Sequence, residues 1–248
     1  MENINVRRII DRLDAFLNRN DCDGAERLLD YWLGQAQEQG DLRSELSLRN
    51  EAMGLARKLG KKEKAVSNGE RALEITGLLN MENTVSGGTT LVNAATVYKA
   101  FGMASRAIPL YEKAEKIYKE TLGENDERLG GLYNNYALAL ADCGMYEEAD
   151  GYYVKALTVM EKVPGGEPER AVTLLNMADC EVMSCGRKKT EKATDLVLRA
   201  KDLLESVENR DGNYAFVCEK CAHVFGYYGL GQYGKELENR AREIYGNG

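Results

Sequence analysis

Cys218 and Cys221 form a CxxC motif that is followed, after one alanine, by His223. A c-type haem attachment site needs the histidine directly after the second cysteine. A structural zinc site needs four ligands, commonly from two such pairs, and Cys180 with Cys185 has the wrong spacing to supply the second pair. A redox CxxC normally opens a helix of a thioredoxin-like fold, whereas this motif falls within a predicted helix. We therefore predict two small buried side chains, with a thiol or zinc site as the minor alternative.

Other patterns that carry chemistry are weak in this sequence. His223 is the single histidine, and no serine or cysteine nucleophile with an orienting carboxylate can be assigned to it from the sequence. The glycine pairs at 87–88 and 165–166 lack the GxxxxGK[ST] pattern, or the strand followed by GxGxxG, of phosphate-binding loops. We therefore predict a protein that is not an enzyme and that has no cofactor and no metal.

Composition excludes several classes of partner. The chain has 248 residues and a net charge of −7, which argues against a general nucleic-acid binder, because such a protein needs a basic face. Its apolar content of 44% and charged content of 29% suit a folded chain. The longest apolar run, 136–141, is far shorter than the roughly 20 residues of a membrane-spanning helix. With no secretory signal evident, we expect a cytoplasmic protein with six reduced cysteines and no membrane partner.

A period of 42 residues organises the sequence. Small residues recur at this interval: Gly60, Gly102, Gly144 and Gly186; Ala65, Ala107 and Ala149; Ala72, Ala114 and Ala156. Positions 41, 83, 125, 167 and 209 follow the same step, and four of these five are good helix N-caps. The chain then divides into units of about 1–40, 41–82, 83–124, 125–166, 167–208 and 209–248. We expect these units to form one solenoid over residues 1–248.

Each unit contains two helical patterns. In the unit 125–166, the first helix is predicted over about 126–143, where Gly144 ends it, and the second over about 146–163. The second pattern places Ala149, Tyr153, Ala156 and Met160 on one face. The recurring alanines allow close helix crossings, and Trp32 replaces one of them in the first unit, where we expect it to fill the end of the core. Sustained alternation of period two is absent, so the predicted fold class is all-α.

Segment 134–157 resembles a tetratricopeptide repeat (TPR). The matching positions are Asn135, Ala137, Gly144, Tyr146, Ala149 and Ala156, and the preceding unit matches through Asn93, Ala95, Gly102, Ala107 and Ala114. The unit 41–82 has Glu51 at the asparagine position, and the unit 167–208 shows small spacing shifts that predict a longer turn. The 42-residue period resembles the kinesin-light-chain type of this family, although the histidine of the inter-repeat loop in that type is absent.

This resemblance implies a right-handed superhelix of about six helix pairs, in which the first helix of each pair lines a concave groove. First-helix segments are poor in charge, and segment 83–102 carries Lys99 as its single charged residue. By resemblance, Asn93 and Asn135 hold the main chain of a bound peptide, with Asn134 and Asn176 as neighbours. Equally, these side chains could tie adjacent helices together, and both interpretations can hold at once.

Basic residues on the first helices suggest a further, minor hypothesis. Lys99, Arg128 and Arg170 could contact an acidic C-terminal tail, as in some proteins of this family, and Arg128 and Arg170 lie one period apart. The alternative is that all three are ordinary solvated residues, and three cations are thin support for a clamp.

The leading hypothesis is a non-catalytic protein–protein interaction module, a scaffold that binds a peptide or protein partner in its groove. The alternative is a peptide-responsive regulatory sensor whose superhelical pitch changes on binding. Because both terminal helices have one apolar face and one charged face, we expect a monomer or a weak homodimer.

Overall fold

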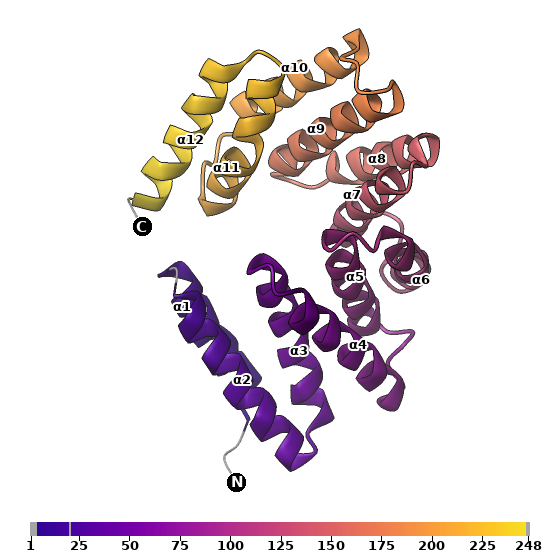
Figure 1. Cartoon of the computed structure of the whole chain (residues 1–248), viewed down its shortest axis with the longest axis vertical. Helices are drawn as coiled ribbons and strands as arrows, with labels where there is room; N and C mark the ends of the chain where they lie inside the picture. The colour runs from indigo at the N-terminus through magenta and orange to yellow at the C-terminus, as the bar shows by residue number, and fades with distance from the viewer. Residues whose placement is uncertain (1–3, 20, 247–248) are drawn as a thin grey trace. The chain divides into compact units, whose positions relative to one another are not determined.

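The computed structural model describes residues 4–19 and 21–246, which form twelve helices in six sequential pairs. The chain forms two compact units, and the boundary lies between residues 122 and 123 (Figure 1). The first unit contains α1 (Val6–Asn18), α2 (Cys22–Gln39), α3 (Leu42–Lys58), α4 (Lys62–Leu78), α5 (Val85–Ala100) and α6 (Ala104–Leu122). The second contains α7 (Glu127–Asp142), α8 (Tyr146–Met160), α9 (Glu167–Ser184), α10 (Glu191–Ser206), α11 (Gly212–Tyr227) and α12 (Gly231–Gly246).

In each unit the first helices of successive pairs contact one another, α3 against α5 in the first unit, and α7 against α9 and α9 against α11 in the second. We call the surface that these odd-numbered helices form in each unit its first-helix face. The predicted all-α fold class is confirmed, and the described residues contain no strand. Within the same residues, no helix combines the length and the apolar character needed to cross a bilayer.

The repeating glycines end the first helix of their pairs. Gly60, Gly102, Gly144 and Gly186 have φ angles of +70°, +73°, +78° and +67°, in the left-handed region that glycine enters without a steric penalty. At Gly186 the turn is longer, and Arg187 also has a positive φ of 65° before α10 begins. The longer turn expected in this unit is therefore confirmed.

The repeating alanines lie at buried helix crossings. All six are completely buried, so a larger side chain is expected to overpack the site: Ala65, Ala72, Ala107, Ala114, Ala149 and Ala156. Small side chains at a constant interval therefore set the spacing between the helices of successive pairs.

The predicted capping positions are correct only at Asp41, whose side chain accepts a hydrogen bond from the Ser44 backbone N–H. The observed caps elsewhere are Thr84 before α5, Asp126 before α7 and Asp211 before α11. Each predicted asparagine is followed, one or two residues later, by another residue type that can cap a helix, and the helix begins after that residue. Glu167 is already inside α9.

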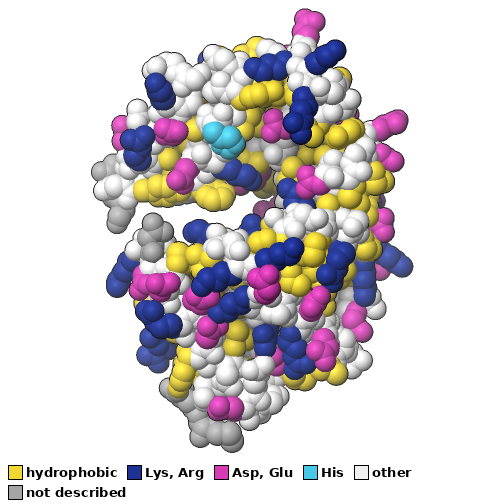
Figure 2. Space-filling model, viewed as in Figure 1, with side chains coloured by type: hydrophobic (Ala, Val, Ile, Leu, Met, Phe, Trp, Pro, Cys, Tyr) yellow, Lys and Arg dark blue, Asp and Glu magenta, His cyan; other side chains and the backbone are white. Residues whose placement is uncertain are grey.

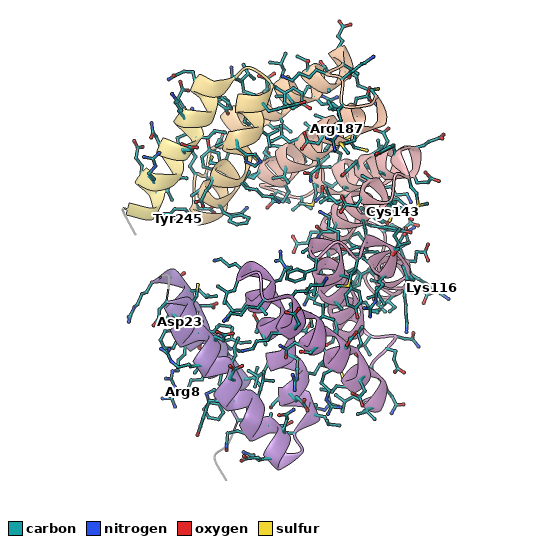
Figure 3. All side chains as sticks on the ribbon, in the orientation of Figure 1. Arg8, Asp23, Lys116, Cys143, Arg187 and Tyr245 are labelled. Carbon is teal, nitrogen blue, oxygen red and sulfur yellow. The ribbon has the colours of Figure 1, made fainter. Side chains whose placement is uncertain are left out.

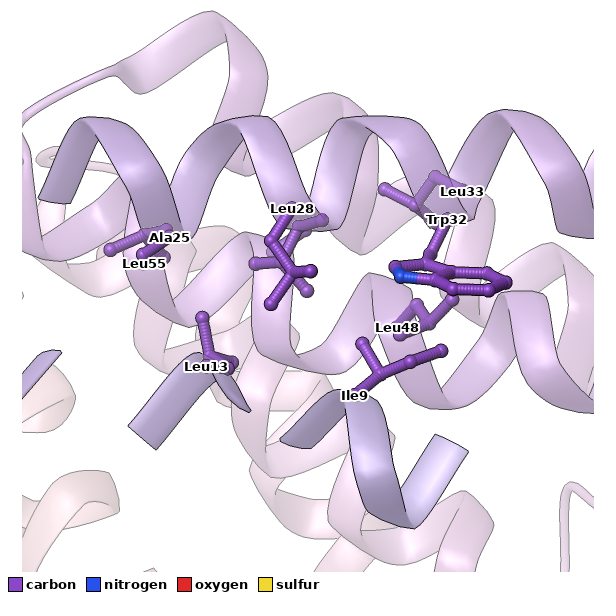
Figure 4. Close-up of a cluster of buried hydrophobic side chains, with 10 residues drawn as sticks. Ile9, Leu13, Ala25, Leu28, Trp32, Leu33, Leu48 and Leu55 are labelled. Carbon is purple, nitrogen blue, oxygen red and sulfur yellow. The ribbon is translucent and has the colours of Figure 1, made fainter. Parts of the chain in front are cut away.

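Trp32 fills the end of the core in the first unit, as its place in the repeat predicts. It packs in a cluster with Ile9 and Leu13 from α1 and Leu48 from α3 (Figure 4). The indole takes the space that the repeating alanine leaves for a neighbouring helix in the inner units.

A buried carboxylate joins α3 and α4, the two helices of the second pair. Glu45 on α3 has a side chain only 2% exposed, and its oxygens accept hydrogen bonds from Arg49 and from Arg71 on α4. Arg49 also donates to Asn68 Oδ1 at 2.7 Å. Burial raises the pKa of Glu45, but the hydrogen bonds from Arg71 and Arg49 outweigh burial, and the pKa is lowered overall.

Candidate functional site

Amide side chains connect the first helices of the first unit. Asn93 on α5 donates from Nδ2 to Asn50 Oδ1 on α3 at 2.9 Å. Asn50 in turn donates to Thr90 Oγ1 at 3.2 Å and to the backbone carbonyl of Leu46 at 3.0 Å. The residue that meets Asn93 is therefore Asn50, and not Glu51, which occupies the position 42 residues earlier. The contact between Asn93 and Asn50 spans 43 residues, so an alignment with a period of 42 does not pair them.

The second unit repeats this connection between its own first helices. Asn176 on α9 donates from Nδ2 to Asn134 Oδ1 on α7 at 3.0 Å. One pair further, Asn213 on α11 donates from Nδ2 to Glu169 Oε1 on α9 at 2.9 Å. The side chains of Asn93, Asn134 and Asn176 thus tie adjacent helices together, and each of these amides still has hydrogen-bonding capacity beyond the single bond described.

An open pocket lies on the first-helix face of the second unit, between α7, α9 and α11, with a volume of about 200 Å³. Asn134 and Asn135 belong to its lining, beside an exposed Phe216 and the ammonium-bearing Lys220. The remaining lining residues are Gly130, Gly131, Met160, Glu169, Val172, Thr173, Asn213 and Val217. Four helices, α7, α8, α9 and α11, contribute to the lining, so this combination of amides, apolar surface and charge is not evident from any single repeat.

The predicted basic residues lie apart from this pocket's lining. Arg128 is exposed at the start of α7 and holds Asp126 with contacts of 2.7 and 2.9 Å. Arg170 lies 3.8 Å from Glu161 and lines a different pocket, between α8, α9 and α10. The one-period separation of Arg128 and Arg170 thus does not place both beside the asparagines. Lys99 is half-buried on α5, in the other unit.

Charges of both signs are distributed over the protein surface. In Figure 2, Lys and Arg side chains are interspersed with Asp and Glu, without a broad region of one sign.

Two carboxyl groups on first helices have raised pKa values. In the second unit, burial raises the pKa of the Asp179 carboxyl on α9, and the nearby His223 on α11 opposes that rise. In the first unit, burial raises the pKa of Glu51, and the neighbouring carboxylate of Asp14 raises it further. The carboxyl groups of Asp179 and Glu51 are therefore less acidic than free ones.

The CxxC motif lies on α11, and both of its cysteines are buried. Burial raises the pKa of the Cys221 thiol to about 12 and also raises that of Cys218, so neither thiol ionises readily near neutral pH. Among the residues that the structure describes, no group of three or more His, Cys, Asp and Glu side chains is arranged to hold a metal ion. The environment of this motif favours packing over thiol chemistry.

Residues 128–206 match the family model of the tetratricopeptide repeat. Together with six sequential helix pairs, left-handed turn glycines and buried crossing alanines, this match identifies the class as a helical repeat array. The described residues adopt a TPR-like solenoid fold, and the family match itself covers residues 128–206.

Solved structures of other proteins share this fold. BtubC (BKLC) from P. vanneervenii superposes with a TM-score of 0.70 at 23% identity, over 81% of this chain and 80% of that one. A putative kinesin light chain from Podospora anserina gives a TM-score of 0.56 at 18% identity, over 80% of this chain and 94% of that one. A Rap protein complexed with Competence and Sporulation Factor gives 0.59 at 14% identity, over 98% and 77%. No curated protein matches the sequence.

Proposed function

We propose that this chain is a non-catalytic interaction module, and that the first-helix face of its second unit binds an extended peptide segment of a partner protein. The observation that carries the proposal is the open pocket between α7, α9 and α11, which combines amide groups with exposed apolar surface. Asparagine amides can pair with both the N–H and the C=O of a peptide backbone, so Asn134 and Asn135 suit main-chain recognition.

The size of the pocket favours a peptide over a small metabolite. Sites for drug-sized ligands usually enclose about 300–1,000 Å³, whereas this pocket has about 200 Å³ and is open to solvent. Such a space suits one side chain of a longer ligand that continues along the helices. A neighbour of the same fold, the Rap protein, was solved with a bound factor, so this type of scaffold can carry a ligand.

Phe216 supports the same proposal because its side chain is 57% exposed beside the pocket. A large apolar ring in water contributes little to folding, and a contact with a ligand would remove apolar area from water. Asn176, in contrast, is already bonded to Asn134, so its truncation would weaken helix packing as well as binding. Asn135 and Phe216 are therefore the better residues for a binding test.

Selection of a phage-displayed library of random peptides on the immobilised protein provides the ligand for this test. A recovered peptide is synthesised with a fluorophore, and its affinity is measured by anisotropy. Phe216→Ala and Asn135→Ala are each expected to weaken binding about tenfold. Tyr245→Ala is the matched control, because Tyr245 is also an exposed aromatic residue, near the end of α12 and outside the pocket lining (Figure 3).

Two results would refute the proposed function. The first is that no peptide is recovered. The second is that the recovered peptides bind both pocket variants and the Tyr245→Ala control with the affinity of the wild-type protein. Circular dichroism at the assay temperature shows whether each variant remains folded.

A further inference from the structure

Two consecutive glycines in the interior of α7 have different surroundings. A Cβ atom on Gly130 would lie 2.3 Å from Met160 Sδ, so the Met160 side chain on α8 would have to move to admit a larger residue at this position. A Cβ atom on Gly131 would meet no heavy atom within 4 Å. Glycine is disfavoured inside helices relative to alanine, and packing explains Gly130 but not Gly131.

Gly131 lies at the pocket of the first-helix face, where the missing side chain leaves space open. Asn134 and Asn135 follow it on α7, and Val172 on α9 and Phe216 on α11 supply apolar surface around the same space. A cavity of about 150 Å³ lined by apolar side chains can admit a benzene ring. At about 200 Å³, this pocket has room for one leucine, methionine or phenylalanine side chain.

Two charged groups of opposite sign line the pocket. The carboxylate of Glu169 accepts a hydrogen bond at Oε1 from the neutral amide of Asn213, near the beginning of α11, and keeps its charge. Lys220 lies on the same face of α11, one turn beyond Phe216, and is exposed. Within residues 4–19 and 21–246, no hydrogen bond or ion pair holds its ammonium group. A carboxylate of a ligand would therefore find its complement at the Lys220 end of the pocket.

We propose that this pocket selects one bulky apolar side chain of the bound peptide, and that an acidic residue adjacent to that side chain pairs with Lys220. The inference rests on the proposed function, since it specifies which peptides the first-helix face of the second unit binds. Gly131 acts as a specificity determinant because the absence of its side chain keeps the pocket open. Asn134 and Asn135 contribute main-chain contacts that do not depend on the ligand's sequence.

The test again uses a phage-displayed library of random peptides and compares the selected sequences. The wild-type protein is expected to enrich Leu, Met or Phe next to Asp or Glu. Gly131→Leu fills the pocket and is expected to weaken a recovered peptide by at least about tenfold, the equivalent of one buried apolar side chain. Gly151→Leu is the matched control, because Gly151 lies on α8 and a Cβ atom there also meets nothing within 4 Å.

Charge reversal tests the second part of the inference. Selection on Lys220→Glu is expected to lose the enrichment of Asp and Glu and to gain Lys or Arg, while the apolar residue is retained. The inference is overturned if peptides bind Gly131→Leu as they bind the wild-type protein while Asn135→Ala abolishes binding. That pattern leaves the proposed function intact. Recovery of no peptide by the wild-type protein refutes both together.

Discussion

Two buried tyrosines, one period apart, have different hydrogen-bonding environments. Tyr111 on α6 and Tyr153 on α8 are both completely buried. The hydroxyl of Tyr111 lies 3.1 Å from Thr96 Oγ1 on α5. The residue 42 positions after Thr96 is Leu138, which has no hydroxyl, and the buried hydroxyl of Tyr153 has no hydrogen-bond partner among the described residues. Burial accordingly raises the pKa of Tyr153 strongly.

The expected effects of removing the two hydroxyls have opposite signs. A buried polar group without a partner costs about 1–3 kcal/mol, so Tyr153→Phe should raise the free energy of unfolding by about that amount. A satisfied hydrogen bond contributes about 0.5–1.5 kcal/mol net, so Tyr111→Phe should lower the free energy of unfolding by that amount. Leu138→Thr should restore a partner for Tyr153, with a favourable coupling of about 1 kcal/mol that vanishes in the Tyr153→Phe background.

Urea denaturation monitored by circular dichroism and by tyrosine fluorescence measures these differences, provided that the two transitions coincide. A Tyr153→Phe variant that loses as much stability as Tyr111→Phe would refute the reasoning, since the hydroxyl of Tyr153 would then be making a favourable contact. Absence of coupling between positions 138 and 153 would show that the two repeats do not place these side chains equivalently.

Three further outcomes are expected. Gly151→Ala should raise the free energy of unfolding by about 0.5–1 kcal/mol in the same urea assay. Gly130→Ala should raise it by less, because the Met160 side chain must move to admit the new Cβ. Glu45→Gln should cost roughly 2–3 kcal/mol, less than a fully buried pair, because both arginines reach solvent. Since the pKa of Glu45 is lowered, this difference should be present above its ordinary value of 4.5 and shrink as the pH falls through the lowered pKa. Iodoacetamide at about pH 8 should alkylate the exposed Cys143 well before the buried Cys221, because the pKa of Cys221 is about 12. Peptide mass spectrometry measures the two alkylation rates. Equal rates would mean that α11 opens readily.

The repeat and its packing could be predicted because they depend on residue types that act locally. A glycine at a left-handed turn and an alanine at a close crossing each allow few substitutes. The interval between Gly102 and Gly144 therefore reveals the helix pairs directly. Helix boundaries were predicted less well, since several neighbouring residues near each loop can cap a helix and their types alone do not decide between them. At α7 that acceptor is Asp126 and not Asn125.

Of the candidate pocket, the sequence predicted Asn134 and Asn135, and the rest of the lining could not be predicted because it depends on departures from the repeat. Gly131 has no packing role, Phe216 lies in a different unit of the repeat, and only folding brings them together. Asn50 was missed for a related reason: the contact to Asn93 spans 43 residues, and a strict period of 42 points to Glu51. A contact between two helices can depart from the strict period by one residue where both side chains are long enough to meet.

The two interpretations of the asparagines are compatible because each amide has four hydrogen-bonding positions. The bond between Asn176 and Asn134 uses one N–H of the first and one lone pair of the second. A ligand backbone could therefore bind to the remaining positions without breaking the connection between α7 and α9. Such an arrangement holds the recognition groups in place before the ligand arrives, which lowers the entropy lost on binding. It follows that truncating Asn176 should weaken peptide binding even if its side chain never touches the ligand, because Asn134 would lose its support.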